Sequence, residues 1–180
     1  MPSAMSPDGL DTNTLPVTRP ARPVTAISVL ARGGLLWMVV AAALACRPGR
    51  WRRAAGRGLA AGAAAMAVGH GIKAVVRRPR PPDGGLPARK ALPEQPKSPA
   101  FPSTHATTAA AFTAAVALTA PAAGAAVTPL AAVVCYSRLR TRAHWPTDVY
   151  GGAAIGAAVG CAVARPGWVR WLWRRVKSAG

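Results

Sequence analysis

The stretch "YSRLRTRAHWPTDVYGG", residues 136–152, places three arginines, a histidine and an aspartate between two apolar runs. No charged residue occurs between His105 and Arg138, and none occurs from Val149 to Ala164. Long apolar runs separated by arginine-rich gaps are typical of membrane spans joined by polar loops. The sequence around this stretch therefore predicts an all-α, integral-membrane helical bundle.

About five transmembrane helices are expected, and a count of five to six is compatible with the pattern. Their predicted ranges are 24–46, 57–74, 103–120, 122–137 and 147–164. The apolar runs fall at or below the roughly 17–25 residues that cross a bilayer. Arg32 interrupts the first run, and an arginine at mid-bilayer costs about 2.5–3.5 kcal/mol unless it snorkels or faces protein.

The chain of 180 residues carries a formal net charge of +18 and is short enough to form a single domain. Residues 1–23 are polar and proline-containing and are expected to form a disordered N-terminal tail. Residues 24–165 form the predicted membrane domain. Residues 166–180 combine tryptophans with cations, which is typical of a tail at the membrane interface.

The sequence "TAPAAG" around Pro121 predicts a short turn between two helices, because proline disfavours helix continuation. This turn places residues 103–105 and 137–148 on the same membrane face. Five arginines in 47–57 and the basic C-terminal tail then share the opposite face, which the positive-inside rule makes cytoplasmic. The long polar loop 75–102 is therefore expected to be extracytoplasmic.

Glycines recur at every fourth position in the last apolar run, at Gly152, Gly156 and Gly160. Small residues at this spacing allow two helix backbones to approach closely in lipid. We expect this face of the last helix to pack against a neighbouring helix. Gly58 and Gly62 have the same spacing in the second run, and their role stays open.

Three clusters of chemically active residues fall on the predicted extracytoplasmic face. They contain Lys73 and Arg80; Ser103, Thr104 and His105; and Arg138, His144 and Asp148. Cations, hydroxyl groups and a helix N-terminus together suit a phosphate group. A neutral imidazole can attack phosphorus, and a nearby carboxylate can hold its tautomer. A second histidine is then available to protonate the departing oxygen.

Other chemistries fit these clusters less well. Asp148 has no second acid nearby, which argues against paired-carboxylate glycoside hydrolysis. No glycine-rich Walker loop is present. A divalent cation bound by histidines and Asp148 would be repelled by Lys73, Arg80 and Arg138. We therefore predict neither a metal site nor a cofactor.

The order and spacing of these residues resemble the type 2 phosphatidic acid phosphatase superfamily, which also contains bacterial acid phosphatases and vanadium haloperoxidases. Its signature is K-x6-R-P, then P-S-G-H, then S-R-x5-H-x3-D. Lys73 and Arg80–Pro81 match the first part, residues 102–105 match the second apart from Thr104, and Ser137 to Asp148 match the third at full spacing. Three ordered motifs are far more specific than any one of them.

The resemblance implies a role for each motif residue. His144 would form a phosphohistidine, Asp148 would assist it, and His105 would be the general acid. The residues that would hold phosphate are Lys73, Arg80, Ser103, Thr104 and Arg138. Thr104 stands where the family has glycine, so its Cβ is expected to crowd the phosphate and to change the rate or the substrate range.

The resemblance implies a metal-independent phosphatase in a bacterial cytoplasmic membrane, with its active site facing outward. The implied partners are membrane lipids and a lipid phosphate substrate: a polyprenyl phosphate or diphosphate, phosphatidic acid or phosphatidylglycerol phosphate. Two other classes stay open. The chain could bind anionic lipid without catalysis, or it could be a basic nucleic-acid-binding protein, for which it offers no recognition fold. Oligomeric state is not predicted.

Overall fold

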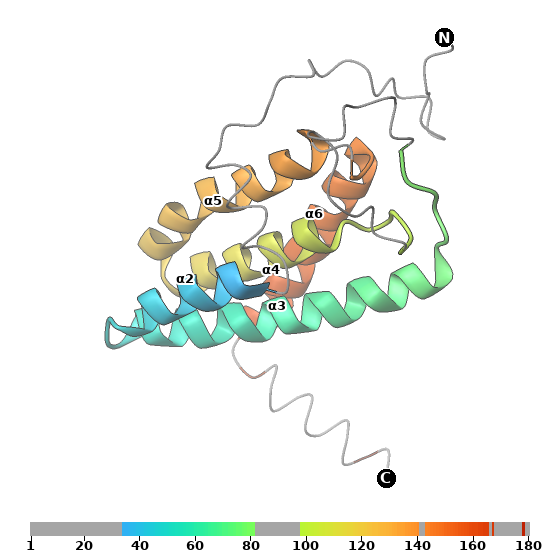
Figure 1. Ribbon diagram of the computed structural model, residues 1–180. Helices are drawn as coiled ribbons and strands as arrows, with labels where there is room; N and C mark the ends of the chain where they lie inside the picture. Colours follow the sequence, from blue (N-terminus) through green and yellow to red (C-terminus); the bar gives the residue numbers. More distant parts are fainter. Residues whose placement is uncertain (1–33, 82–97, 141–142, 166, 168–177, 179–180) are drawn as a thin grey trace.

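The computed structural model describes residues 34–81, 98–140, 143–165, 167 and 178 (Figure 1). Within these ranges the chain forms helices and no strands. The helices are α2 (Leu35–Ala45), α3 (Arg50–Val75), α4 (Thr104–Thr119), α5 (Pro121–Arg140) and α6 (Pro146–Ala164). The predicted N-terminal tail, residues 24–33 of the first predicted helix, and most of the predicted C-terminal tail lie outside the described residues.

The second predicted helix is longer than the sequence indicated, because α3 begins at Arg50 rather than at residue 57. Arginine and alanine are among the strongest helix formers, so the basic stretch continues the helix backward toward Gly49. Gly49 has a φ of 72°, a conformation that glycine adopts without steric cost, and it ends the turn after α2. Most of the predicted basic turn at 47–57 is therefore helical.

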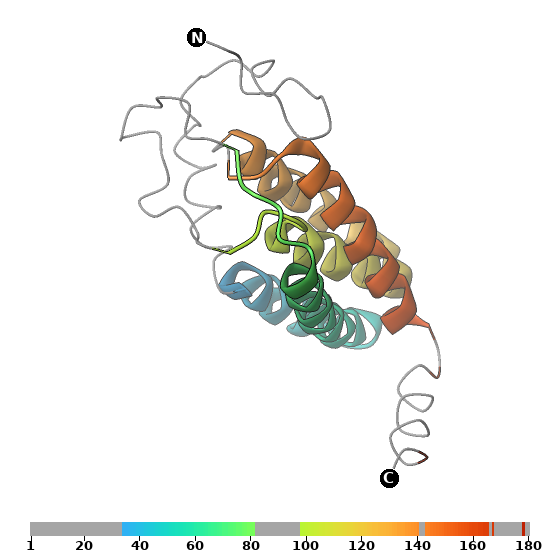
Figure 2. The ribbon, with the colours of Figure 1, turned by 90° about the vertical axis from the view of Figure 1, so that its right-hand side faces the viewer.

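Helix α4 lies at the centre of the bundle and packs against α3, α5 and α6 (Figures 1 and 2). Helix α2 lies along α3 and adds Trp37 to the core, where its ring centroid is 5.1 Å from that of Phe112. Phe112 and Val116 of α4 are completely buried. The core is otherwise rich in alanine, which keeps the helices close together.

Prolines begin two of the helices. Pro121 starts α5 directly after Ala120, whose φ of −144° and ψ of 88° are not helical, and Pro146 starts α6. Proline suits a first helical position because its missing N–H would have no helical partner there. The break at Pro121 makes α4 and α5 antiparallel, so the start of α4 and the end of α5 lie at the same end of the bundle (Figure 1). The predicted turn at this position is confirmed.

Three described helices, α3, α5 and α6, are long and apolar enough to cross a membrane. Helix α4 has 16 residues, and the short apolar helix α2 has 11. Large apolar side chains point outward from the bundle, as expected where lipid replaces water. They include Met38, Val39, Val75, Leu118 and Tyr150. The predicted all-α, integral-membrane bundle is confirmed.

The glycine face of α6 packs directly on α4. A Cβ at Gly152 would lie 2.9 Å from the Ser103 carbonyl oxygen, and a Cβ at Gly156 would collide with the Thr107 carbonyl oxygen. At Gly160 the colliding group would be the carbonyl of Ala111. The predicted packing role of this face is confirmed. In α3, a Cβ at Gly58 would lie 2.8 Å from the Phe112 ring, so that glycine also allows a close approach to α4.

We expect Gly156→Ala to destabilise the protein by about 1–3 kcal/mol, because the added methyl group must push α6 away from the α4 backbone. The thermal midpoint measured in detergent should fall by several degrees. Gly71→Ala is the matched control, since Gly71 lies in α3 and a Cβ there meets no atom within 4 Å. Equal midpoints for the two variants would contradict the proposed packing constraint.

Candidate active site

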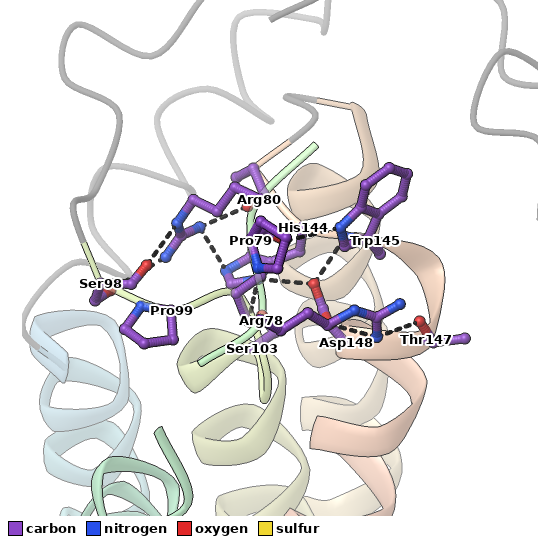
Figure 3. A network of polar contacts seen from close by, with 12 residues as sticks. Arg78, Pro79, Arg80, Ser98, Pro99, Ser103, His144, Trp145, Thr147 and Asp148 are labelled. Atoms are coloured by element: carbon purple, nitrogen blue, oxygen red, sulfur yellow. Dashed lines mark hydrogen bonds and ion pairs between the residues drawn. The ribbon is translucent and has the colours of Figure 1, made fainter. Parts of the chain in front are cut away.

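The end of the bundle where α4 and α6 begin gathers the polar side chains (Figure 3). The extended segment 76–81 leaves α3 and crosses this end, and residues 98–103 lead into α4. Ser103 connects the N-terminal ends of α4 and α6, because its backbone N–H donates to the Asp148 carbonyl oxygen at 3.0 Å. Residues that are far apart in the sequence therefore meet at one face, as the order of the helices predicted.

His144 lies just before α6, with 7 % of its surface exposed. Its Nδ1 lies 2.8 Å from the carbonyl oxygen of Ala100. A carbonyl oxygen only accepts hydrogen bonds, so Nδ1 carries the hydrogen. In the neutral ring, Nε2 is then unprotonated and its lone pair accepts hydrogen bonds. Nε2 lies 3.4 Å from Nη1 of Arg80, on the cationic side of the site.

Arg80 is held by four contacts that fix its guanidinium beside His144. Nε donates to the Ser98 carbonyl oxygen at 3.0 Å, and Nη2 donates to the Ser98 hydroxyl at 3.2 Å. Nη1 donates to the Ala143 carbonyl oxygen at 2.5 Å and lies near His144 Nε2. Burial lowers the pKa of Arg80 from its ordinary value, and the Asp148 carboxylate opposes that shift. A fixed guanidinium is well suited to an anion with several oxygens.

Lys73 lies in the last turn of α3 and is buried. Its Nζ donates to the carbonyl oxygen of Pro99 at 2.5 Å. Three consecutive carbonyls, of Ser98, Pro99 and Ala100, therefore accept hydrogen bonds from Arg80, Lys73 and His144 respectively. This segment, residues 98–100, sets the positions of three functional groups that come from different parts of the chain.

Asp148 is completely buried in the first turn of α6. Its Oδ2 accepts the backbone N–H of Trp145 at 2.9 Å, which satisfies a free donor at the helix start. The same oxygen lies 3.7 Å from His144 Nδ1. The Asp148 carboxylate thus lies near the His144 ring, as predicted, but the carbonyl oxygen of Ala100 lies closer to Nδ1.

The other predicted site residues lie on the adjoining helix ends. Ser103 is completely buried, and its Oγ has no hydrogen-bond partner among the described residues. Thr104 and His105 occupy the first turn of α4 and are partly exposed. Arg138 lies in the last turn of α5, is 4 % exposed, and donates from Nε to the Ser137 hydroxyl at 3.1 Å. Their chemical roles stay predictions.

Two contacts at this site were not predicted. Arg78, which lies outside the three motifs, donates from Nη1 to Asp148 Oδ1 at 3.0 Å. Trp145, also outside the motif positions, donates from Nε1 to the Pro79 carbonyl oxygen at 3.0 Å and is 3 % exposed. Alternate side chains of an extended segment point to opposite sides, so Arg78 shares a side with Arg80 while Arg77 is exposed. That alternation could have identified Arg78 from the sequence.

The environment of His144 favours the neutral ring. Burial lowers the pKa of His144 below its ordinary value of 6.5. The hydrogen-bonding influence of Asp148 raises it, and the positive charges of Arg80 and Lys73 lower it further. The lowering effects prevail, so the ring is uncharged at neutral pH, with the lone pair of Nε2 available.

Comparison with known proteins identifies the family. The sequence pattern of the PAP2 superfamily matches residues 55–174, which is most of the chain. No curated protein sequence matches the chain significantly. Among solved structures, the chain is similar to the first transmembrane PAP2 type phosphatidylglycerolphosphate phosphatase from Bacillus subtilis, with 21 % identity and a TM-score of 0.59. The match covers 78 % of this chain and 73 % of that chain.

The chain therefore belongs to the PAP2 superfamily, and it has the fold of a transmembrane member. This result confirms the resemblance inferred from the three motifs. The matched region includes α3 from residue 55 onward, α4, α5, α6 and every predicted site residue.

The lowered pKa of His144 predicts how stability depends on pH. Between that lowered pKa and 6.5, the unfolded chain binds more protons at this residue than the folded one. Folding stability should therefore decrease as pH falls from 6.5 through this interval. In His144→Gln this contribution disappears, so thermal midpoints measured in detergent from about pH 7.5 to pH 5 should fall less steeply than in the wild type.

Identical slopes in His144→Gln and the wild type would show that His144 is not held neutral by the fold.

Proposed function

We propose that this protein is a membrane lipid phosphatase that transfers the phosphoryl group of its substrate to His144 and then to water. The observation that carries the proposal is the orientation of a neutral histidine among cations. The Ala100 carbonyl holds the hydrogen of His144 on Nδ1, and the unprotonated Nε2 faces Arg80, whose Nη1 lies 3.4 Å away and donates to it. A nucleophile in this position meets the phosphorus of any phosphate bound by Arg80.

The groups around Nε2 supply the charge that a phosphate requires. Lys73 uses one of its three N–H donors on Pro99, which leaves two for the substrate. The Ser103 hydroxyl and the backbone N–H groups at the start of α4 add neutral donors. Arg80 and Arg138 complete the proposed phosphate-binding set. Thr104 belongs to the same turn. Its Cβ would leave less room for the phosphate beside this turn than the glycine of other family members would.

In the first step, the Nε2 lone pair of His144 forms a bond to phosphorus and the bond from phosphorus to the lipid oxygen breaks. Protonated His105 gives its proton to that oxygen, so the lipid product leaves without an added charge. Asp148 balances the positive charge that develops on the His144 ring. In the second step, water attacks phosphorus, the nitrogen–phosphorus bond breaks, and the proton of water passes to His105.

The proposed reaction requires no metal ion. Arg80 and Lys73 approach His144 closely enough to lower its pKa. The same positive charges would oppose a divalent cation at that position. Fixed guanidinium and ammonium groups then stabilise the charge on the phosphoryl oxygens.

A lipid substrate is supported by the apolar surface beside the site. Val75 is 83 % exposed and lies two positions from Lys73, and Tyr150 is 67 % exposed and lies two positions from Asp148. Lipid-facing surface thus reaches the edge of the cationic site. A substrate whose tails stay in the bilayer can place its phosphate there. Suitable substrates are polyprenyl phosphates or diphosphates, phosphatidic acid and phosphatidylglycerol phosphate.

The main alternative is a protein that binds anionic lipid without catalysis. The environment of His144 argues against it, because a site used only for binding would gain from a protonated histidine. Burial instead lowers the pKa of this residue. The fixed tautomer of His144 and the position of Nε2 beside Arg80 suit nucleophilic attack.

Purified protein should release inorganic phosphate from at least one member of the proposed lipid panel, and His144→Ala should lower that rate by at least about 10³-fold. Activity should persist in EDTA and should be inhibited by vanadate, which mimics the pentacoordinate phosphorus. The assay measures phosphate release in detergent micelles containing each lipid in turn. Full activity in His144→Ala would exclude the phosphohistidine, and loss in EDTA with rescue by metal would exclude the metal-independent mechanism.

The proposed site faces the outside of a bacterial cytoplasmic membrane. Reporter domains fused after Ala120 should be cytoplasmic, because the turn between α4 and α5 lies at the opposite end of the bundle from the start of α4. Fusions after Ser98 should be extracytoplasmic. A paired alkaline phosphatase and fluorescent protein assay distinguishes these locations. The opposite pattern would place the site in the cytoplasm and would overturn this orientation.

A further inference from the structure

Arg78 lies in the extended segment after α3, where its guanidinium contacts Asp148, whereas Arg80 contacts Nε2 of His144. We infer that Arg78 is a positioning residue for catalysis: it fixes the Asp148 carboxylate and the Ala100 carbonyl that hold His144. This inference rests on the proposed phosphohistidine mechanism. It gives Arg78 a task different from that of Arg80, which lies two residues further along the same segment.

The side chain of Arg78 determines the position of one carboxylate oxygen. Nη1 of Arg78 lies 3.0 Å from Asp148 Oδ1 and 2.9 Å from the Thr147 hydroxyl. The Arg78 side chain is 14 % exposed and that of Asp148 is 0 % exposed, so water screens this ion pair weakly. The other oxygen, Oδ2, accepts the Trp145 N–H. With one fixed donor on each oxygen, the carboxylate cannot rotate away from the ring.

The main chain of Arg78 contributes a second constraint. Its carbonyl oxygen accepts the backbone N–H of Ala100 at 2.9 Å. The carbonyl of Ala100 in turn accepts the Nδ1 hydrogen of His144. Arg78 is therefore joined to both groups near Nδ1: to Asp148 through its guanidinium (Figure 3) and to Ala100 through its backbone.

The two arginines of this segment contact opposite sides of the imidazole ring. The contacts of Arg80 lie on the Nε2 side, where the phosphate is proposed to bind. The guanidinium of Arg78 contacts Asp148, which lies on the Nδ1 side. When Nε2 attacks phosphorus, positive charge develops on the ring, and the oriented carboxylate stabilises it. Loss of Arg78 should therefore affect the reaction step and leave phosphate binding nearly unchanged.

The test compares Arg78→Gln with Arg77→Gln in the full-length protein, using the lipid phosphate that the wild type hydrolyses best. Arg77 carries the same charge in the adjacent position but is exposed, so it controls for the loss of one positive charge. We expect Arg78→Gln to lower kcat by about 10-fold to 100-fold, as is typical for groups that orient a reacting side chain. KM should change by less than about threefold. Arg77→Gln should keep the wild-type kcat.

A double-mutant cycle with Asp148→Asn distinguishes positioning from a general structural effect. If Arg78 acts through Asp148, then Arg78→Gln should lower kcat little further when Asp148 is already asparagine. Thermal midpoints of all variants show whether each is folded. If Arg78→Gln does not fold, Arg78→Lys replaces it in the same cycle, because lysine keeps the charge but cannot reproduce the guanidinium contacts to Thr147 and Asp148.

The inference for Arg78 would be overturned if Arg78→Gln lowered kcat equally in the wild type and in Asp148→Asn. It would also be overturned if Arg78→Gln raised KM and left kcat unchanged. Equal losses in Arg77→Gln and Arg78→Gln would do the same. In these cases His144→Ala would still abolish activity, and the proposed function would stand. If His144→Ala were instead fully active, the proposed function would fail and the role of Arg78 would fail with it.

Discussion

The hydrogen bond from His144 Nδ1 to the Ala100 carbonyl determines which nitrogen of the ring faces the cationic side of the site. A carbonyl can only accept, so this contact keeps the hydrogen on Nδ1 and leaves the lone pair on Nε2. Burial among Arg80 and Lys73 keeps the ring uncharged. The proposed chemistry depends on this combination, since a protonated or rotated ring could not attack phosphorus.

That hydrogen bond depends in turn on how the helices pack. The absence of side chains at Gly152 and Gly156 lets α6 approach the α4 backbone, and the Ser103 N–H then reaches the Asp148 carbonyl. This contact joins the starts of the two helices. The segment 98–100 enters α4 at the same point, with its carbonyls directed at Lys73, Arg80 and His144. A stripe of small residues along a membrane helix thus controls the geometry of a polar site at its end.

Much of this arrangement could be predicted from the sequence. Charge-free runs indicated the membrane helices, and Pro121 indicated the turn that brings His105 and His144 to one face. The third motif indicated that the Asp148 carboxylate lies near the His144 ring, and Asp148 Oδ2 lies 3.7 Å from His144 Nδ1. These predictions succeed because they rest on local patterns: hydrophobicity, proline chemistry and helical periodicity.

Other features could not be read from residue identities. Backbone carbonyls carry no sequence signal, so the role of Ser98, Pro99 and Ala100 appears only in three dimensions. The early start of α3 at Arg50 was missed because arginines were interpreted as loop charges, although they are strong helix formers. Alternation along the segment could have placed Arg78 on the side of Arg80, but its partner, Asp148, is 70 positions away and could not be identified from the sequence.

The most direct measurement of the central claim is rapid-quench mass spectrometry of the enzyme during turnover of a lipid phosphate. A histidine nucleophile predicts a transient, acid-labile phosphoryl group on the peptide that contains His144. It should accumulate when Asp148 and His105 are intact and should be absent in His144→Ala. A phosphoryl group on another residue, or steady turnover with no phosphorylated enzyme detected at any quench time, would contradict the account.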